Sequence, residues 1–152
     1  MEYLSKSVEE TAKIASNFAK NLKPNGNSAT LVGLYGELGS GKTTFMKYLA
    51  ESFGIEETIK SPTFVIMKIF PLSFTRRGVR GEVENLIHID AYRIEKEEEM
   101  LNLGWQEIIA DPKNLICIEW ADKITGIMPS HIMITFEHGD KENERKITIN
   151  KV

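Results

Sequence analysis

The feature that most constrains this chain is a glycine-rich segment, GELGSGKT at residues 36–43, set between two patterned stretches. The stretch before it, Leu31–Leu34, is apolar and typical of a strand, and the stretch after it repeats apolar residues from Phe45 to Phe53 at helical spacing. A Gly-x4-Gly-Lys-Thr pattern between a strand and a helix is typical of a P-loop. The alternative is a glycine-rich turn before a core helix.

A P-loop binds phosphate because its glycines let successive backbone N–H groups turn toward an anion, while the following helix adds unpaired donors and its positive dipole end. We expect Lys42 to reach the β- and γ-phosphates and the Thr43 hydroxyl to ligate Mg²⁺. The residues predicted to bind the nucleotide here are Gly36, Glu37, Leu38, Gly39, Ser40, Gly41, Lys42, Thr43 and Thr44.

Two later apolar runs end in a carboxylate, Leu86–Asp90 and Leu115–Glu119. Open α/β sheets place ligand chemistry at the carboxyl ends of their strands, which makes Asp90 a candidate to ligate Mg²⁺ or orient water. Four apolar residues followed by Glu119 match a Walker B strand. Alternatively, Asp90 caps the next turn, and Glu119 is a charged residue at a strand end with no part in metal binding. Since Mg²⁺ takes one or two carboxylates, Thr43 with Glu119 or Asp90 suffices.

Three further residues are candidates for contact with a nucleotide. Thr11 lies in the first turn of a helix that the capping box Ser7 to Glu10 opens, where it could touch a base or simply face solvent. Trp120 either packs near the nucleotide or covers the core. Arg145 begins the last strand, where it is either an edge residue or an arginine that reaches the phosphates, as in some NTPases.

Two other segments stay open on sequence grounds. Ser61-Pro62-Thr63 places two hydroxyls just before a β-branched run, where they could have a functional role. Ser, Pro and Thr are also residues typical of an ordinary turn. Residues 71–85 contain Arg76, Arg77 and Arg80 and suggest an exposed loop. This loop is either a solvated connection without a specific function or a basic patch suited to binding phosphate or RNA. His88 alternates with apolar residues, which is more typical of a core residue than of a ligand.

Composition limits the function classes. A chain of 152 residues fits one domain, 1–152, and its net charge of −3 lacks the basic footprint of a protein that grips nucleic acid unaided. The single cysteine, Cys117, and an N-terminus without a signal-peptide pattern lead us to expect a cytoplasmic protein. The fold class predicted is α/β: a P-loop NTPase-like three-layer sandwich with a mainly parallel central sheet and an antiparallel C-terminal hairpin. The arms of this hairpin are His131–Phe136 and Arg145–Asn150, joined by a polar turn from Glu137 to Glu144.

The ordered motifs GELGSGKTT, SPTF, HIDAYR and IEWAD resemble those of the TsaE family, also called YjeE, the ATPase subunit of the bacterial machinery that installs threonylcarbamoyladenosine in tRNA. The resemblance implies ATP and Mg²⁺ as cofactors and weak ATP hydrolysis that matters in complex with the partners TsaB and TsaD, so that tRNA is met indirectly. The nucleotide cycle would support turnover by these partners without transferring the threonylcarbamoyl group.

Carried over by motif, the resemblance assigns Lys42 and Thr43 to the P-loop and Asp90 to a motif needed for activity. Glu119 and Trp120 fall in the segment near metal and nucleotide, and Thr63 in a loop that would act like a switch facing the γ-phosphate. Residues 71–85 depart from the family in being longer and richer in arginine.

Two other functions fit the same motifs. A small-molecule or nucleotide kinase would use the arginines of 71–85 as a lid and Asp90 as a base, although 152 residues leave little room for an acceptor domain. A nucleotide-sensing scaffold would bind ATP and change partner affinity without useful hydrolysis. The chain contains no Asn/Thr-Lys-x-Asp segment that would read guanine, which favours ATP over GTP.

Overall fold

The computed structural model describes residues 1–57, 59, 66–72 and 83–152, and within them seven strands form one sheet in the order β1-β7-β6-β2-β5-β4-β3. The strands are β1 (Glu2–Ser5), β2 (Thr30–Tyr35), β3 (Met67–Pro71), β4 (Asn85–Asp90), β5 (Asn114–Glu119), β6 (Ile132–His138) and β7 (Arg145–Lys151). Strands β6, β2, β5 and β4 run parallel at the centre. On one side β3 pairs antiparallel with β4, and on the other β7 pairs antiparallel with β6 and β1 with β7. The mainly parallel sheet and the β6–β7 hairpin are confirmed.

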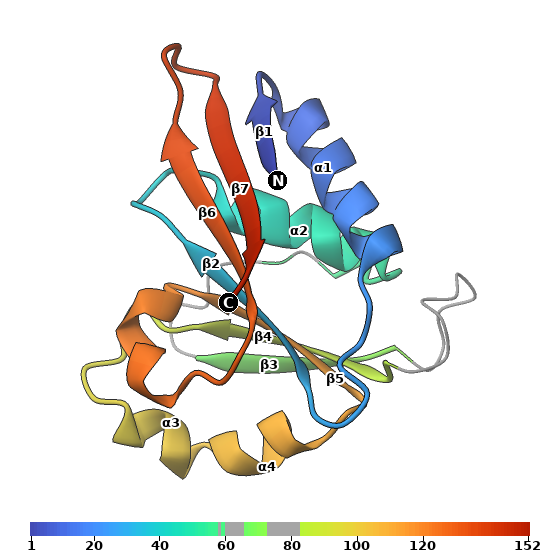
Figure 1. Cartoon of the computed structure of the whole chain (residues 1–152), viewed down its shortest axis with the longest axis vertical. Helices are drawn as coiled ribbons and strands as arrows, with labels where there is room; N and C mark the ends of the chain where they lie inside the picture. Colours follow the sequence, from blue (N-terminus) through green and yellow to red (C-terminus); the bar gives the residue numbers. More distant parts are fainter. Residues whose placement is uncertain (58, 60–65, 73–82) are drawn as a thin grey trace.

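Helices cover both faces of this sheet (Figure 1). On one face lie α1 (Val8–Asn21) and α2 (Lys42–Ser52), and on the other α3 (Glu98–Asn102), α4 (Trp105–Ala110) and a 3₁₀ segment, η1 (Ala121–Ile127). Each face has its own apolar core, with Phe45 of α2 in the first and Trp105 of α4 in the second. The three-layer prediction is therefore confirmed.

The start of α1 follows the predicted capping box with one change. The Ser7 hydroxyl accepts a hydrogen bond from the Glu10 N–H at 3.2 Å, which makes Ser7 the N-cap. The Glu10 carboxylate accepts from the N–H of Lys6 at 2.7 Å, one residue before the N-cap. This bond fixes the path of the chain between β1 and α1. The sequence contained no clear signal for β1, because only Ser5 of its four residues is buried.

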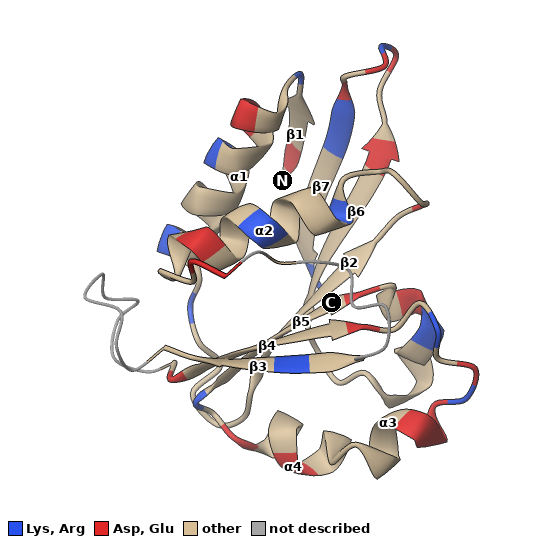
Figure 2. Cartoon of the chain, turned by 180° about the vertical axis from the view of Figure 1, so that it is seen from behind, with Lys and Arg blue, Asp and Glu red and all other residues tan. Residues whose placement is uncertain are grey.

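No helix in the described ranges is both long and apolar enough to cross a bilayer. Lysine and arginine are interspersed with aspartate and glutamate over the ribbon seen in Figure 2. This mixed pattern agrees with the small net charge of the chain.

Gly33 in β2 makes room for a tyrosine that lies along the sheet. A Cβ at Gly33 would stand 2.7 Å from Cε2 of Tyr35 and 3.1 Å from Cβ of Ala121. With that space free, the Tyr35 hydroxyl reaches Nε2 of His131 at 2.8 Å and the two rings stack. Burial, and the carboxylate of Asp122 to a smaller extent, raise the pKa of this hydroxyl above its ordinary value.

We predict that Gly33→Ala lowers the free energy of unfolding by about 1–3 kcal/mol, because the added methyl group overpacks the space that Tyr35 fills. In a Tyr35→Ala background the same change should cost much less, since its clash partner is gone. Urea unfolding of the four proteins of this double-mutant cycle measures the coupling. Strictly additive losses would show that the tyrosine is not the obstacle.

Candidate functional site

The segment between β2 and α2 is a glycine loop that ends at an uncapped helix. Gly41, with φ 106°, is the N-cap of α2, and among the described residues no side-chain capping bond is made at this helix start. The first backbone donors of α2 are therefore available to an outside group, and the positive end of the helix dipole lies at the same place. This is the arrangement that an anion requires.

Gly36 sets the path of the loop against β6. Its φ is 149°, and a Cβ there would lie 2.5 Å from the carbonyl oxygen of Phe136 and 2.7 Å from Oγ of Ser40. The Ser40 side chain is buried, and its hydroxyl has no hydrogen-bond partner within the part of the chain that the structure describes. Only glycine fits at 36 without displacing the loop.

The Lys42 side chain stabilises this loop by hydrogen bonds to its backbone. Its ammonium donates to the carbonyl oxygens of Gly36 and Glu37 at 2.5 and 2.7 Å, and only 5% of the residue is exposed. Since an ammonium carries three donors, one remains for an outside acceptor. Burial lowers the pKa of Lys42 below its ordinary value, an effect opposed by the carboxylates of Glu119, Asp122 and Asp90.

Glu119, at the end of β5, joins the loop helix to the neighbouring strand. Its Oε1 accepts a hydrogen bond from the Thr43 hydroxyl at 2.6 Å, and its Oε2 lies 2.7 Å from Nε2 of His88 in β4. Glu119 is 1% exposed and His88 is 3% exposed. The carboxylate therefore fixes the direction of the hydroxyl that the sequence predicts as a Mg²⁺ ligand.

Asp90 ends β4 directly beside Glu119 in the sheet register. Its Oδ1 accepts from the N–H of Tyr92 at 3.0 Å, which is the turn-capping contact considered as the alternative role. The residue is 8% exposed. The strand-end position and the capping bond thus occur together, and two carboxylates meet at one edge of the sheet.

Trp120 follows Glu119 and is the one non-glycine residue with a positive φ among those described, at φ 58° and ψ 44°. Its ring centroid is 3.9 Å from the Lys42 ammonium and 5.0 Å from the Tyr92 ring centroid. A bulky residue in this left-handed region carries backbone strain, which the ring contacts offset in part. Trp120 therefore borders the Lys42 ammonium and also packs against the core on the α4 side of the sheet, and its contact with a nucleotide stays a prediction.

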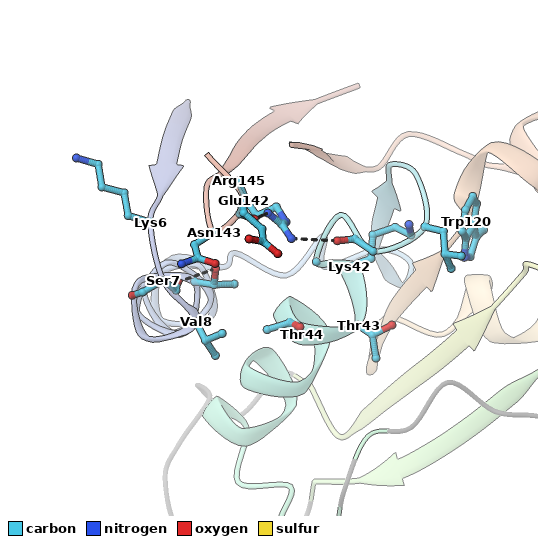
Figure 3. Close-up of a pocket in the computed structure, with 14 residues that line it drawn as sticks. Lys6, Ser7, Val8, Lys42, Thr43, Thr44, Trp120, Glu142, Asn143 and Arg145 are labelled. Carbon is cyan, nitrogen blue, oxygen red and sulfur yellow. Dashed lines mark hydrogen bonds between the residues drawn. The ribbon is translucent and has the colours of Figure 1, made fainter. Parts of the chain in front are cut away.

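A cavity of about 580 Å³ opens beside the loop (Figure 3). It lies between the start of α1, the start of α2 and the turn that joins β6 to β7. Its lining includes most residues that the sequence predicted for nucleotide contact, namely Thr11, Leu38, Gly39, Gly41, Lys42, Thr43, Thr44, Trp120 and Arg145. In Figure 3 the Lys42 side chain lies between Arg145 and Trp120.

The other predicted residues have different positions. Gly36, Glu37 and Ser40 shape the loop and are not among the lining residues, while Glu119 reaches the cavity wall through Thr43. Thr63 and the arginines at 76, 77 and 80 lie outside the described residues. Thr11 is buried, with its hydroxyl 2.7 Å from that of Ser5, so the solvent-facing alternative is wrong.

Arg145 is anchored at the rim of the cavity. Its guanidinium donates to the carbonyl oxygens of Glu142 and Glu144 at 2.7 and 2.8 Å and to that of Gly39 at 3.3 Å. The last bond links the C-terminal hairpin to the glycine loop. A cation is thereby held beside the loop. The alternative of an edge-strand residue is wrong, because β7 lies between β1 and β6 in the sheet.

Sequence reasoning missed five lining residues: Lys6, Ser7, Val8, Glu142 and Asn143. It assigned Ser7 and Val8 to the opening of a helix and 142–143 to a polar turn. No pattern in the sequence brings these segments together. Their approach follows from the pairing of β1 with β7, which lays the start of α1 beside the hairpin.

The described residues contain no group of three or more His, Cys, Asp or Glu side chains arranged to hold a metal ion.

The fold and the loop define a P-loop-type α/β protein, and comparison with known proteins identifies its family. The solved structure titled "Crystal structure of Bacillus subtilus YdiB" superposes with a TM-score of 0.70 at 28% identity, over 100% of this chain and 85% of that one. The tRNA threonylcarbamoyladenosine biosynthesis protein TsaE of Rickettsia prowazekii is 36% identical over 147 residues, which cover 95% of this chain and 91% of the relative.

The protein of the same name from Bacillus subtilis is 35% identical over 144 residues, which cover 95% of this chain and 81% of the relative. The family model described as threonylcarbamoyl adenosine biosynthesis protein TsaE matches residues 5–147. This chain therefore belongs to the TsaE family, as its motifs led us to expect.

We predict that Gly36→Ala destabilises the chain by at least about 2 kcal/mol, because it adds both backbone strain and a clash with β6. Gly39→Ala is the matched control: its φ is 74°, but a Cβ there meets no atom within 4 Å. Only strain of about 1 kcal/mol is expected for the control. Equal losses in urea unfolding would contradict the close approach at Gly36.

Proposed function

We propose that this protein is a Mg²⁺-dependent ATPase that supports threonylcarbamoyl modification of the tRNA adenosine next to the anticodon, acting with TsaB and TsaD partners. The observation that carries the proposal is the tied loop: Lys42 bonded to the carbonyls of Gly36 and Glu37, beside an uncapped helix start. That arrangement presents backbone donors and an ammonium to a phosphate chain.

The cavity supports a nucleotide as the ligand. Its volume of about 580 Å³ lies in the range of pockets that hold small molecules and cofactors. The glycine loop and Arg145 supply positive charge at one side, and Val8 and Thr11 extend the lining away from the loop. We assign the phosphates to the loop and the base to the α1 side, with ATP preferred over GTP.

The donor set fits Mg²⁺, which prefers oxygen ligands. Thr43 supplies a hydroxyl whose proton is already donated to Glu119, which leaves the oxygen lone pairs for a cation. Thr43, Glu119 and Asp90 are the residues proposed to hold the ion. Bound there, Mg²⁺ would neutralise phosphate charge.

Hydrolysis would depend on positioning. Phosphoryl transfer needs little covalent participation by protein, so fixed charges and an oriented water carry the catalysis. Asp90 lies at the strand end beside Glu119, and its carboxylate is the group we assign to orient the water. Lys42 and the backbone donors of α2 would stabilise the charge on the transferred phosphoryl group.

The protein would act on tRNA indirectly, through its partner proteins. The net charge is −3, and lysine and arginine are interspersed with aspartate and glutamate along the coloured ribbon of Figure 2. The relatives that carry the TsaE name are themselves named for tRNA threonylcarbamoyladenosine biosynthesis. For this chain we propose the role of a nucleotide-driven subunit that renews the partner complex.

We predict that Lys42→Ala weakens ATP binding by about 10- to 100-fold, since hydrogen bonds to charged groups contribute about 1.5–3 kcal/mol. Lys47→Ala is the control, because Lys47 lies on the same helix and its ammonium stands over the Tyr48 ring at 5.3 Å, outside the cavity lining. Titration calorimetry measures both. An unchanged ATP affinity of Lys42→Ala would contradict the proposed binding of phosphates by Lys42 and the glycine loop.

We predict that Asp90→Asn lowers the rate of ATP hydrolysis by about 10²-fold or more and lowers ATP affinity by a smaller factor, because the amide still accepts from Tyr92 N–H but cannot act as a carboxylate. Phosphate release, alone and with TsaB, TsaD and tRNA, gives the rate. If the variant still supports repeated rounds of tRNA modification, hydrolysis is unnecessary and the scaffold function is correct. ADP formation only on addition of a phosphate acceptor would instead indicate a kinase.

A further inference from the structure

One buried histidine beside the site has no role in the function proposed above. His88 lies on β4, two residues before Asp90, and is 3% exposed. The sequence pattern favoured an ordinary core residue. In the structure, however, its Nε2 is 2.7 Å from Oε2 of Glu119, which is itself 1% exposed.

The sheet register explains why these side chains meet. In the parallel pair β4–β5, His88 is opposite Cys117 and Asp90 is opposite Glu119, so all four lie on one face of the sheet. Cys117 belongs to the same core cluster as residues of α2, which identifies this face as the one that the P-loop helix covers. His88 thus lies behind the strand-end carboxylates, on the side toward the core.

The two hydrogen bonds of Glu119 involve different oxygens and come from different elements. Thr43 on α2 donates to Oε1 and His88 on β4 meets Oε2. With Glu119 ionised, the shared proton is on Nε2, and the imidazole is the donor. A buried carboxylate needs such donors to offset its desolvation, and a donor on each oxygen also fixes the rotation of the carboxylate plane.

We propose that His88 is a positioning residue: its Nε2–H holds the Glu119 carboxylate so that the other oxygen orients the Thr43 hydroxyl toward the Mg²⁺ of a bound nucleotide. The inference rests on the proposed function. His88 contacts neither nucleotide nor metal in this arrangement. Because His88 acts on Thr43 through Glu119, its loss should reduce only the part of the nucleotide affinity that depends on Mg²⁺.

The test compares nucleotide binding with and without Mg²⁺. His88→Leu removes the donor, whereas His88→Gln keeps an amide N–H the same number of bonds from Cα as the imidazole Nε2. His131→Leu is the matched control, because His131 also has a hydrogen-bonded Nε2, to Tyr35, but does not line the cavity. Titration calorimetry with ADP and with a non-hydrolysable ATP analogue, in MgCl₂ and in EDTA, gives the gain in affinity due to Mg²⁺.

We expect His88→Leu to lose about 10- to 100-fold of that gain, the usual effect of removing a group that orients a metal ligand, with affinity in EDTA unchanged. His88→Gln should recover most of the gain, and His131→Leu should keep it. If His88→Leu does not fold, as judged by circular dichroism, His88→Asn replaces it, because its amide N–H lies one bond closer to the backbone.

Three results would overturn the proposal: a full Mg²⁺ gain in His88→Leu or its replacement, equal losses in MgCl₂ and EDTA, or no recovery in His88→Gln. The first and third would show that the donor is unimportant, and the second that His88 only supports the fold. A wild-type chain that binds both nucleotides without any Mg²⁺ gain would contradict the proposed function itself and the inference with it.

Discussion

The site depends on the burial of one carboxylate. Glu119 is almost fully enclosed, yet it ends a strand and follows four apolar residues, so its charge must be met by donors from within the fold. The donors come from the first turn of α2 and from β4. This requirement fixes the helix start against two strand ends, and the geometry of the phosphate loop follows from it.

The cavity is completed by segments from both ends of the chain. β1 pairs with β7, and Arg145, the first residue of β7, bonds to the glycine loop through Gly39. The start of α1 is carried to the same place by the short link from β1, which the Lys6 to Glu10 bond fixes. The β6–β7 hairpin therefore forms one wall of the cavity and also joins β1 to the parallel part of the sheet.

Local patterns predicted the parts of the structure that depend on local physics. The P-loop, the cap at Ser7, the acids Asp90 and Glu119 at strand ends, and the final hairpin all have short-range signals, and the described residues contain each of them. The contact of His88 with Glu119 could not be read in the same way, because it depends on which strands are neighbours and in which register. The same holds for Val8 and Asn143 in the cavity wall.

The two tryptophans of the chain occupy unlike surroundings. Trp105, the first residue of α4, is enclosed in the core, where its indole N–H donates to the carbonyl oxygen of Ile127. Trp120 stands against a lysine charge at the mouth of the cavity. An indole beside a cation has an excited state that responds to the position of that charge, so the chain carries its own optical reporter at the phosphate loop, with Trp105 as a shielded internal reference.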